Sequence, residues 1–194
     1  IKSELEILKA KDLLNEFIVL ENQRLKNIVD DYLVKTETLF AKVLSDKGSP
    51  FLKSIIINKG SKHGVNLGMV AMDEEYLVGK VVEVNYLSSR VLLLSDLNSK
   101  IPATVEPSGL LSILSGTGQD YGVIQYSKKY KDIKGHSIIY TSGTSGLFKA
   151  GIPIGKINDS LLNDERKVEF FSDFSQLKFV KIFAFAKNGA EWQN

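Results

Sequence analysis

The sequence predicts a mainly β protein in which a long N-terminal α-helix precedes two small β-barrel domains. First, residues 1–44 contain neither glycine nor proline, whereas all fifteen glycines and all four prolines follow them. These residue types disrupt helix interiors and are needed in turns. Second, short runs rich in β-branched and aromatic residues fill the chain from Ser54 onward. Third, no helix-length segment separates these runs, which argues against β-α-β units.

The N-terminal helix is expected over residues 1–44, with the breaker-rich residues 45–50 as the joint to the β region. Fully helical, this segment would be about 66 Å long, at about 1.5 Å per residue. A lone helix of that length needs a partner that covers its apolar stripe. We expect a coiled coil that makes the chain a homodimer or a higher assembly. The alternatives are packing along the chain's own β region or a polar spacer.

Two heptad registers fit the helix and share Ile18, Leu25 and Tyr32. One register completes the seam with isoleucine and leucine at 7, 14 and 28 but also brings Glu21 inside, and Lys11 lies one heptad before Ile18 in both registers. The other includes two asparagines one heptad apart, and buried asparagines specify the register of a parallel two-stranded coil. We prefer this second register. Its seam consists of Leu8, Asn15, Ile18, Asn22, Leu25, Val29 and Tyr32.

The β region is read as about eleven short strands, which fit two small barrels better than one large barrel. The last run alternates but is apolar on both faces except at its lysines, which suggests a largely buried strand. The expected strands are Ser54–Asn58, Met69–Met72, Tyr76–Val84, Arg90–Ser95, Pro102–Val105, Leu110–Leu114, Tyr121–Ser127, Ser137–Thr141, Ile152–Ile157, Lys167–Phe171 and Leu177–Ala186.

Composition excludes several classes of function. The 194 residues are 43% hydrophobic and 25% charged with a net charge of +2, as in ordinary soluble domains. Only three cations are arginines, which argues against nucleic-acid binding. The absence of cysteine excludes thiolate metal sites, cysteine nucleophiles and disulfides. No cofactor, metal site or small-molecule substrate is predicted. No apolar run reaches the roughly 18 residues of a membrane span, and the start at Ile1 suggests a fragment of a longer protein.

Three motifs invite a chemical reading. The glycines at 60, 64 and 68 resemble a phosphate-binding loop, but no following helix is expected, so tight turns explain them better. Ser145 in a glycine-flanked loop, with His63 and Asp96 upstream, is the alternative of a chymotrypsin-like serine hydrolase. Tyr121, Tyr126 and Tyr130 beside a lysine cluster form a candidate partner interface, with a solvated loop as the simpler reading.

Three further stretches are distinctive, namely Asn58–Val70, Tyr76–Asp96 and Tyr140–Ile157, which follow in that order behind a helix that contains Leu20-Glu21-Asn22. Together they resemble the MreC family of bacterial rod shape-determining proteins. Small residues expected in turns mark the resemblance. They are Gly60, Gly64, Gly68, Gly79, Gly143, Gly146, Gly151, Pro153 and Gly155.

The resemblance implies a non-enzymatic scaffold of the cell-elongation machinery. Such proteins bind and help activate the class B penicillin-binding transpeptidase in peptidoglycan synthesis, with MreD, RodZ and indirectly MreB as further partners, and they self-associate. The resemblance also implies an extracytoplasmic location, with the parent protein anchored in the inner membrane by a span missing from this chain. The implied domains are a coiled-coil helix at 1–44, a first barrel at 45–98 completed by 159–194, and a second barrel inserted at 99–158.

Overall fold

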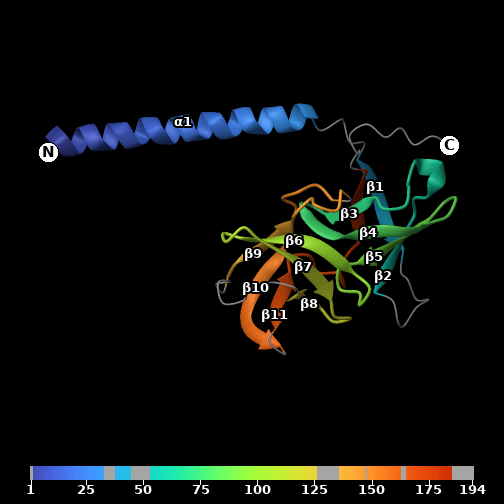
Figure 1. Cartoon of the computed structure of the whole chain (residues 1–194). Helices are drawn as coiled ribbons and strands as arrows, with labels where there is room; N and C mark the ends of the chain where they lie inside the picture. Colours follow the sequence, from blue (N-terminus) through green and yellow to red (C-terminus); the bar gives the residue numbers. More distant parts are fainter. Residues whose placement is uncertain are drawn as a thin grey trace. The chain divides into compact units, whose positions relative to one another are not determined.

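The computed structural model describes residues 2–32, 38–44, 53–125, 136–146, 148–162 and 165–184. The chain divides into two compact units, Ile1–Thr36 and Glu37–Asn194. The first contains the helix α1 (Lys2–Tyr32), and the second contains two closed β-barrels (Figure 1). The predicted fold class, mainly β with a long N-terminal helix and two small barrels, is therefore confirmed.

The first barrel closes in the order β1-β12-β3-β4-β5-β2, with every described pair antiparallel. A one-turn 3-10 helix, η1 (Ser61–His63), lies between β2 and β3. The strands of this barrel are β1 (Leu39–Leu44), β2 (Ser54–Ile57), β3 (Val70–Asp73), β4 (Tyr76–Val84), β5 (Ser89–Leu93) and β12 (Phe179–Phe183).

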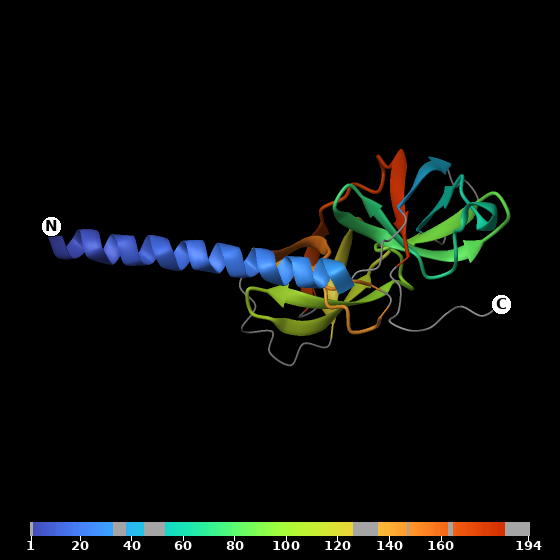
Figure 2. The same cartoon turned by 90° about the horizontal axis from the view of Figure 1, so that it is seen from above.

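The second barrel closes in the order β10-β11-β8-β7-β6-β9 and is also antiparallel in every described pair. Its strands all fall between β5 and β12 in the sequence, so the chain crosses between the barrels twice. The strands are β6 (Lys100–Glu106), β7 (Leu110–Gly116), β8 (Tyr121–Gln125), β9 (Ile138–Thr141), β10 (Pro153–Leu162) and β11 (Glu165–Phe170). Figure 2 shows the two barrels from above.

Three sequence expectations need correction. Helix α1 is described over Lys2–Tyr32, and Leu39–Leu44, expected to be helical, is strand β1, in which Ala41 is buried between exposed Phe40 and Lys42. Strand β11 pairs with β8 and β10, so residues 165–170 belong to the second barrel and not to the first. Strand β12 is fully buried only at Val180 and Ile182, and its first residue, Phe179, is 60% exposed.

The apolar cores of the two barrels are joined. One buried cluster contains Val70, Leu77 and Leu94 from the first barrel and its exit together with Ile101 and Leu114 from the second. A second cluster fills the rest of the first barrel. Phe174, in the crossover from β11 to β12, packs against both clusters. The barrels therefore share packing as well as two covalent connections.

Candidate functional site

The helix presents its apolar side chains to solvent within the single chain. Between Glu4 and Arg24 every described side chain is exposed except Glu21, which is half-buried. Ile18 is the least exposed of the large apolar residues at 47%, and Leu13 the most exposed at 67%. An uncovered apolar surface of this extent is typical of an interaction site.

The structure describes the side chains of four of the seven residues in the predicted seam. Leu8, Asn15, Ile18 and Asn22 are all exposed on α1. Leu25, Val29 and Tyr32 lie in the same helix, but their side chains fall outside the described part of the structure. The exposure of the first four is compatible with both heptad registers, so the seam remains a prediction.

The predicted tyrosine interface is represented by Tyr121 alone, because Tyr126, Tyr130 and the neighbouring lysines lie outside the described residues. Tyr121 is half-buried on β8, and the Lys167 ammonium lies 4.3 Å from the centroid of its ring. Sequence reasoning missed this cation–π contact. The two residues are diagonal neighbours on the paired strands β11 and β8. The contact could be found only once this pairing was known.

A polar cluster continues from Tyr121 across β11 to β10. Glu169 lies opposite Tyr121 in register, accepts a hydrogen bond of 2.6 Å from the Asn158 amide, and lies 3.4 Å from the Lys156 ammonium. The Asn158 hydrogen bond first, and then the one from Lys156, hold the pKa of Glu169 below its ordinary value. Glu169, Lys156 and Lys167 therefore each have a partner within the barrel.

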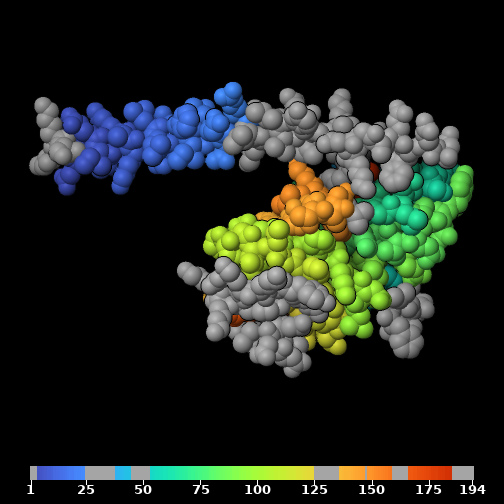
Figure 3. Space-filling model, viewed as in Figure 1, coloured from blue at the N-terminus to red at the C-terminus, as the bar shows by residue number. Residues whose placement is uncertain are grey.

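An uncharged strip runs across the outside of the second barrel on β9, β6 and β7. Tyr140, Thr104 and Leu111 lie side by side in register, and Leu111 is 61% exposed. Strands β7 and β9 contain no charged residue, and the charged residues of β6 are its two terminal ones, Lys100 and Glu106. Figure 3 shows atoms of β6 and β7 (yellow-green) at the surface of the molecule. Sequence reasoning did not single out this strip, although the uncharged run of β7 was its signal.

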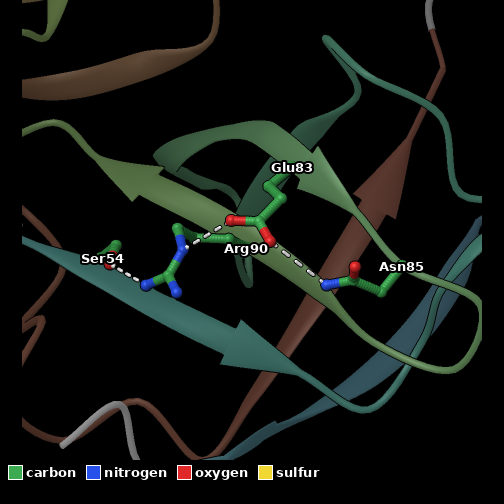
Figure 4. A network of polar contacts seen from close by, with 4 residues as sticks. All are labelled: Ser54, Glu83, Asn85 and Arg90. Atoms are coloured by element: carbon green, nitrogen blue, oxygen red, sulfur yellow. Dashed lines mark hydrogen bonds and ion pairs between the residues drawn. The ribbon is translucent and has the colours of Figure 1, made fainter. Parts of the chain in front are cut away.

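The corresponding outer face of the first barrel is polar and internally paired. Arg90 donates through Nε to Glu83 at 3.1 Å and through Nη1 to Ser54 at 3.1 Å, and Asn85 donates to Glu83 at 3.3 Å (Figure 4). A partner that covered this face would have to displace or desolvate the network. A partner would therefore lose less free energy to desolvation of charged groups on the uncharged strip of the second barrel than on this face of the first.

The hydrolase alternative does not fit the local hydrogen bonds. In a Ser-His-Asp triad the imidazole Nδ1–H donates to the aspartate. Here Nδ1 of His63 accepts a hydrogen bond of 3.2 Å from the Gly60 backbone, and the Asp96 carboxylate is occupied by Lys53 and Asn98. Thus His63 and Asp96 do not prepare Ser145 as a nucleophile.

The described residues offer neither a metal site nor a membrane span on a helix. In the described residues, no group of three or more histidine, aspartate or glutamate side chains could hold a metal ion. No helix in the same portion of the chain combines the length and the apolar character required to cross a membrane.

The motif glycines divide into two structural groups. Gly64, Gly68, Gly143, Gly146 and Gly151 have positive φ angles, as turn glycines do, and Gly60 precedes η1. The expectation of turns is wrong for the other two glycines and for Pro153, since β4 contains Gly79 and β10 contains Pro153 and Gly155. A Cβ atom on Gly79 would lie 2.0 Å from the Leu92 carbonyl oxygen, so this glycine permits close approach of a neighbouring strand.

Comparisons with known proteins converge on one family. The family described as "Rod shape-determining protein MreC, barrel core" matches residues 43–184. A cell shape-determining protein MreC from Cereibacter sphaeroides is 34% identical over 141 residues, which are 72% of this chain and 46% of the relative. The chain spans about half the length of the curated relatives it matches.

Solved structures give the same result for the fold. MreC from Listeria monocytogenes superposes with a TM-score of 0.74 at 25% identity, covering 99% of this chain and 97% of the other. The chain is also similar in fold, at a TM-score of 0.62 and 14% identity, to MreC in a complex with penicillin-binding protein PBP2 from Helicobacter pylori. That alignment covers 79% of this chain and 100% of the other.

Proposed function

The chain belongs to the MreC family of rod shape-determining proteins, and from this membership we propose that it is a non-catalytic scaffold of the cell-elongation machinery. In this role it binds a class B penicillin-binding transpeptidase outside the cytoplasm and helps to activate peptidoglycan synthesis. The observation that carries the proposal is the match of the barrel core to the family. The complex of the Helicobacter pylori relative with PBP2 supports the choice of partner.

We assign the transpeptidase contact to the uncharged strip of β9, β6 and β7. Interface cores are depleted in charged residues and enriched in aromatic and large apolar ones. The strip offers Leu111 and Tyr140 as anchors, whereas the β8-β11-β10 face contains the ion pair of Lys156 and Glu169, which a partner would have to desolvate. The predicted interface at Tyr121, Tyr126 and Tyr130 is the competing surface.

The helix serves a second kind of contact in this proposal. Its exposed apolar side chains pair two copies of the chain through the seam that contains Ile18. MreD, RodZ and indirectly MreB are the further partners expected for the whole protein, which a membrane span in the parent chain would anchor. Self-association and transpeptidase binding then use different parts of the chain and can be removed separately.

Direct binding tests the proposed function. The purified chain is immobilised, and the extracytoplasmic part of the class B transpeptidase from the same genome is passed over it. We expect saturable binding that weakens about tenfold or more in Leu111→Lys, because truncation or charging of a central anchor costs at least about 1.4 kcal/mol.

The matched control is Leu67→Lys, which places the same charge on a similarly exposed leucine of the other barrel and should bind like wild type. Tyr121→Ala tests the competing surface. Absence of wild-type binding would reject the proposed function. A loss confined to Tyr121→Ala would retain the function and move the surface.

A further inference from the structure

We propose that Asp96 is the positioning residue that fixes the angle between the two barrels, so that the chain presents both as one rigid body. This inference goes beyond the scaffold function. It concerns the geometry of the chain itself and can be tested without any partner.

The chain crosses between the barrels at residues 94–99 and again at residues 171–178. Each crossover contains an aspartate whose side chain accepts a hydrogen bond from the backbone N–H two residues on. Such turns are common and usually satisfy only their own backbone. The two aspartates differ in what else they bind, and that difference carries the proposal.

Asp96 reaches out of its own turn into the first barrel. One carboxylate oxygen accepts a hydrogen bond of 2.8 Å from the backbone N–H of Lys53, which immediately precedes β2. The other oxygen accepts two bonds from Asn98, at 2.7 Å from its backbone and 3.0 Å from its amide. Asp96 is only 1% exposed, so these N–H groups replace the water that a carboxylate otherwise needs.

The same short crossover is bonded to the second barrel by its backbone. Gly118 donates to the Ser95 carbonyl at 2.7 Å, and Gly116 donates to the Ser99 carbonyl at 3.0 Å. A Cβ atom on Gly116 would lie 2.0 Å from the carbonyl oxygen of Asp96, so the glycine lets β7 approach the turn closely. Asp96 therefore ties β2 of one barrel to a segment that is itself fixed on β7 of the other.

Apolar packing alone would leave the angle less well specified. The cluster shared by the barrels brings Leu77 and Leu94 against Ile101 and Leu114, but burial of apolar surface has no preferred direction. Hydrogen bonds constrain both distance and angle. A buried carboxylate with three donors adds this directional constraint at the joint.

Asp173 in the second crossover provides the internal contrast. It is exposed and accepts hydrogen bonds from the backbone N–H and the hydroxyl of Ser175, at 2.9 and 2.6 Å. Both bonds stay within its own turn. Asp173→Asn is therefore a matched control for Asp96→Asn, since both remove the charge of an aspartate in an inter-barrel turn.

Distance measurements between the barrels test the proposal. The full chain has no cysteine, so Leu67→Cys and Leu111→Cys introduce one nitroxide site on an exposed residue of each barrel. Double electron–electron resonance is recorded with an excess of unlabelled chain, so that self-association adds no distances between labels. We expect one narrow distance distribution in the doubly labelled chain and in its Asp173→Asn variant. In the Asp96→Asn variant we expect the distribution to become broad or to shift to another distance.

Circular dichroism of each variant checks that the barrels are folded. A broad distribution in the background protein would overturn the proposal, and so would a folded Asp96→Asn variant with an unchanged distribution. If Asp96→Asn loses its β signal, Asn98→Ala decides, because it removes a single donor to Asp96 and leaves the backbone intact. A broadened distribution in Asn98→Ala supports the joint, and an unchanged one contradicts it.

Discussion

The helix and the barrels use the same aliphatic residues in opposite ways. Ile154 of β10 is fully buried, whereas Ile18 of α1 is 47% exposed in the single chain. The barrels bury their apolar residues in two adjoining clusters and close their strand edges by pairing. The helix satisfies its backbone internally but leaves its apolar stripe open. Isolated helices gain little stability in water without a packed apolar face.

This difference separates fold stability from assembly. We expect residues in the barrels to determine whether the barrels fold, and the exposed apolar residues on α1 to contact other molecules. Substitutions of the same chemical kind should therefore change different measurements in the two regions.

The largest effect is expected from Ile18→Glu, because Ile18 belongs to the seam in both heptad registers. Each buried isoleucine contributes about 1.5–3 kcal/mol, and a dimer loses two of them. The dissociation constant should rise about a hundredfold or more, measured by sedimentation velocity over a concentration series. The thermal unfolding of the barrels should not change. Val19→Glu, an exposed neighbour outside both seams, is the matched control. Equal masses for all three proteins would contradict the coiled coil.

The register can be sharpened with two further leucines. Leu14→Glu disrupts the seam only in the register that includes Leu14, and Leu8→Glu only in the preferred register with Asn15 and Asn22. We expect Leu8→Glu to weaken association more than Leu14→Glu. The reverse order would select the other register. Both leucines are exposed to a similar degree in the single chain, 62% and 57%, so the comparison isolates their role in assembly.

The barrels should respond in the opposite sense to Ile154→Ala. Removal of this buried side chain from the second barrel leaves a cavity and should lower the free energy of unfolding by about 2–5 kcal/mol. Urea denaturation followed by circular dichroism measures the change. Ile18→Ala is the control and should change the barrel transition by less than about 0.5 kcal/mol. A similar loss in both variants would mean that the helix contributes to barrel stability.

Strand β1 marks where sequence patterns predicted the fold and where they failed. The absence of glycine and proline to residue 44 correctly indicated a helix but did not locate its end. Burial alternates along β1, with Ala41 inside and Phe40 and Lys42 outside, but its residues are apolar except for Lys42, so the sequence carried no period of two that would separate this strand from the helix. Strand β12 was predicted to be largely buried, because its residues are mostly apolar. Its Phe179 is exposed because only one face of a closed barrel packs inside.

The candidate surfaces were predictable only where one element carries them. The apolar stripe of the helix follows from local periodicity, so Ile18 could be proposed as a seam residue from the sequence. The strip of Tyr140, Thr104 and Leu111 depends on the pairing of three strands. Such non-local register is not contained in any one motif. The role of Asp96 required the same kind of information, because Lys53 is 43 residues away.

Two glycines of the second barrel allow the cost of a steric clash between strands to be compared with the cost of a positive φ angle. A Cβ atom on Gly155 would lie 2.2 Å from the carbonyl oxygen of Glu169, so Gly155→Ala should cost about 3 kcal/mol through displacement of β11. Gly151 has a φ of +87° with open space around it, so Gly151→Ala should cost only about 1 kcal/mol of backbone strain. Urea midpoints compare the two. Equal losses would mean that the strands separate readily at Gly155.

The smallest effect is expected at the barrel surface, where Glu169 tests whether a partly exposed charge contributes to the fold. Its pKa is held below the ordinary value of 4.5, chiefly by the Asn158 hydrogen bond. A carboxylate with a lowered folded pKa stabilises the fold above its unfolded pKa, and this contribution disappears as the pH falls through the folded value. Glu169→Gln should therefore lower the urea midpoint slightly at neutral pH, and the difference from wild type should vanish in acid.

Asn158→Ala should return the pKa of Glu169 toward 4.5 in a carbon-detected NMR titration. A difference that persists in acid would assign the effect of Glu169→Gln to packing and not to charge.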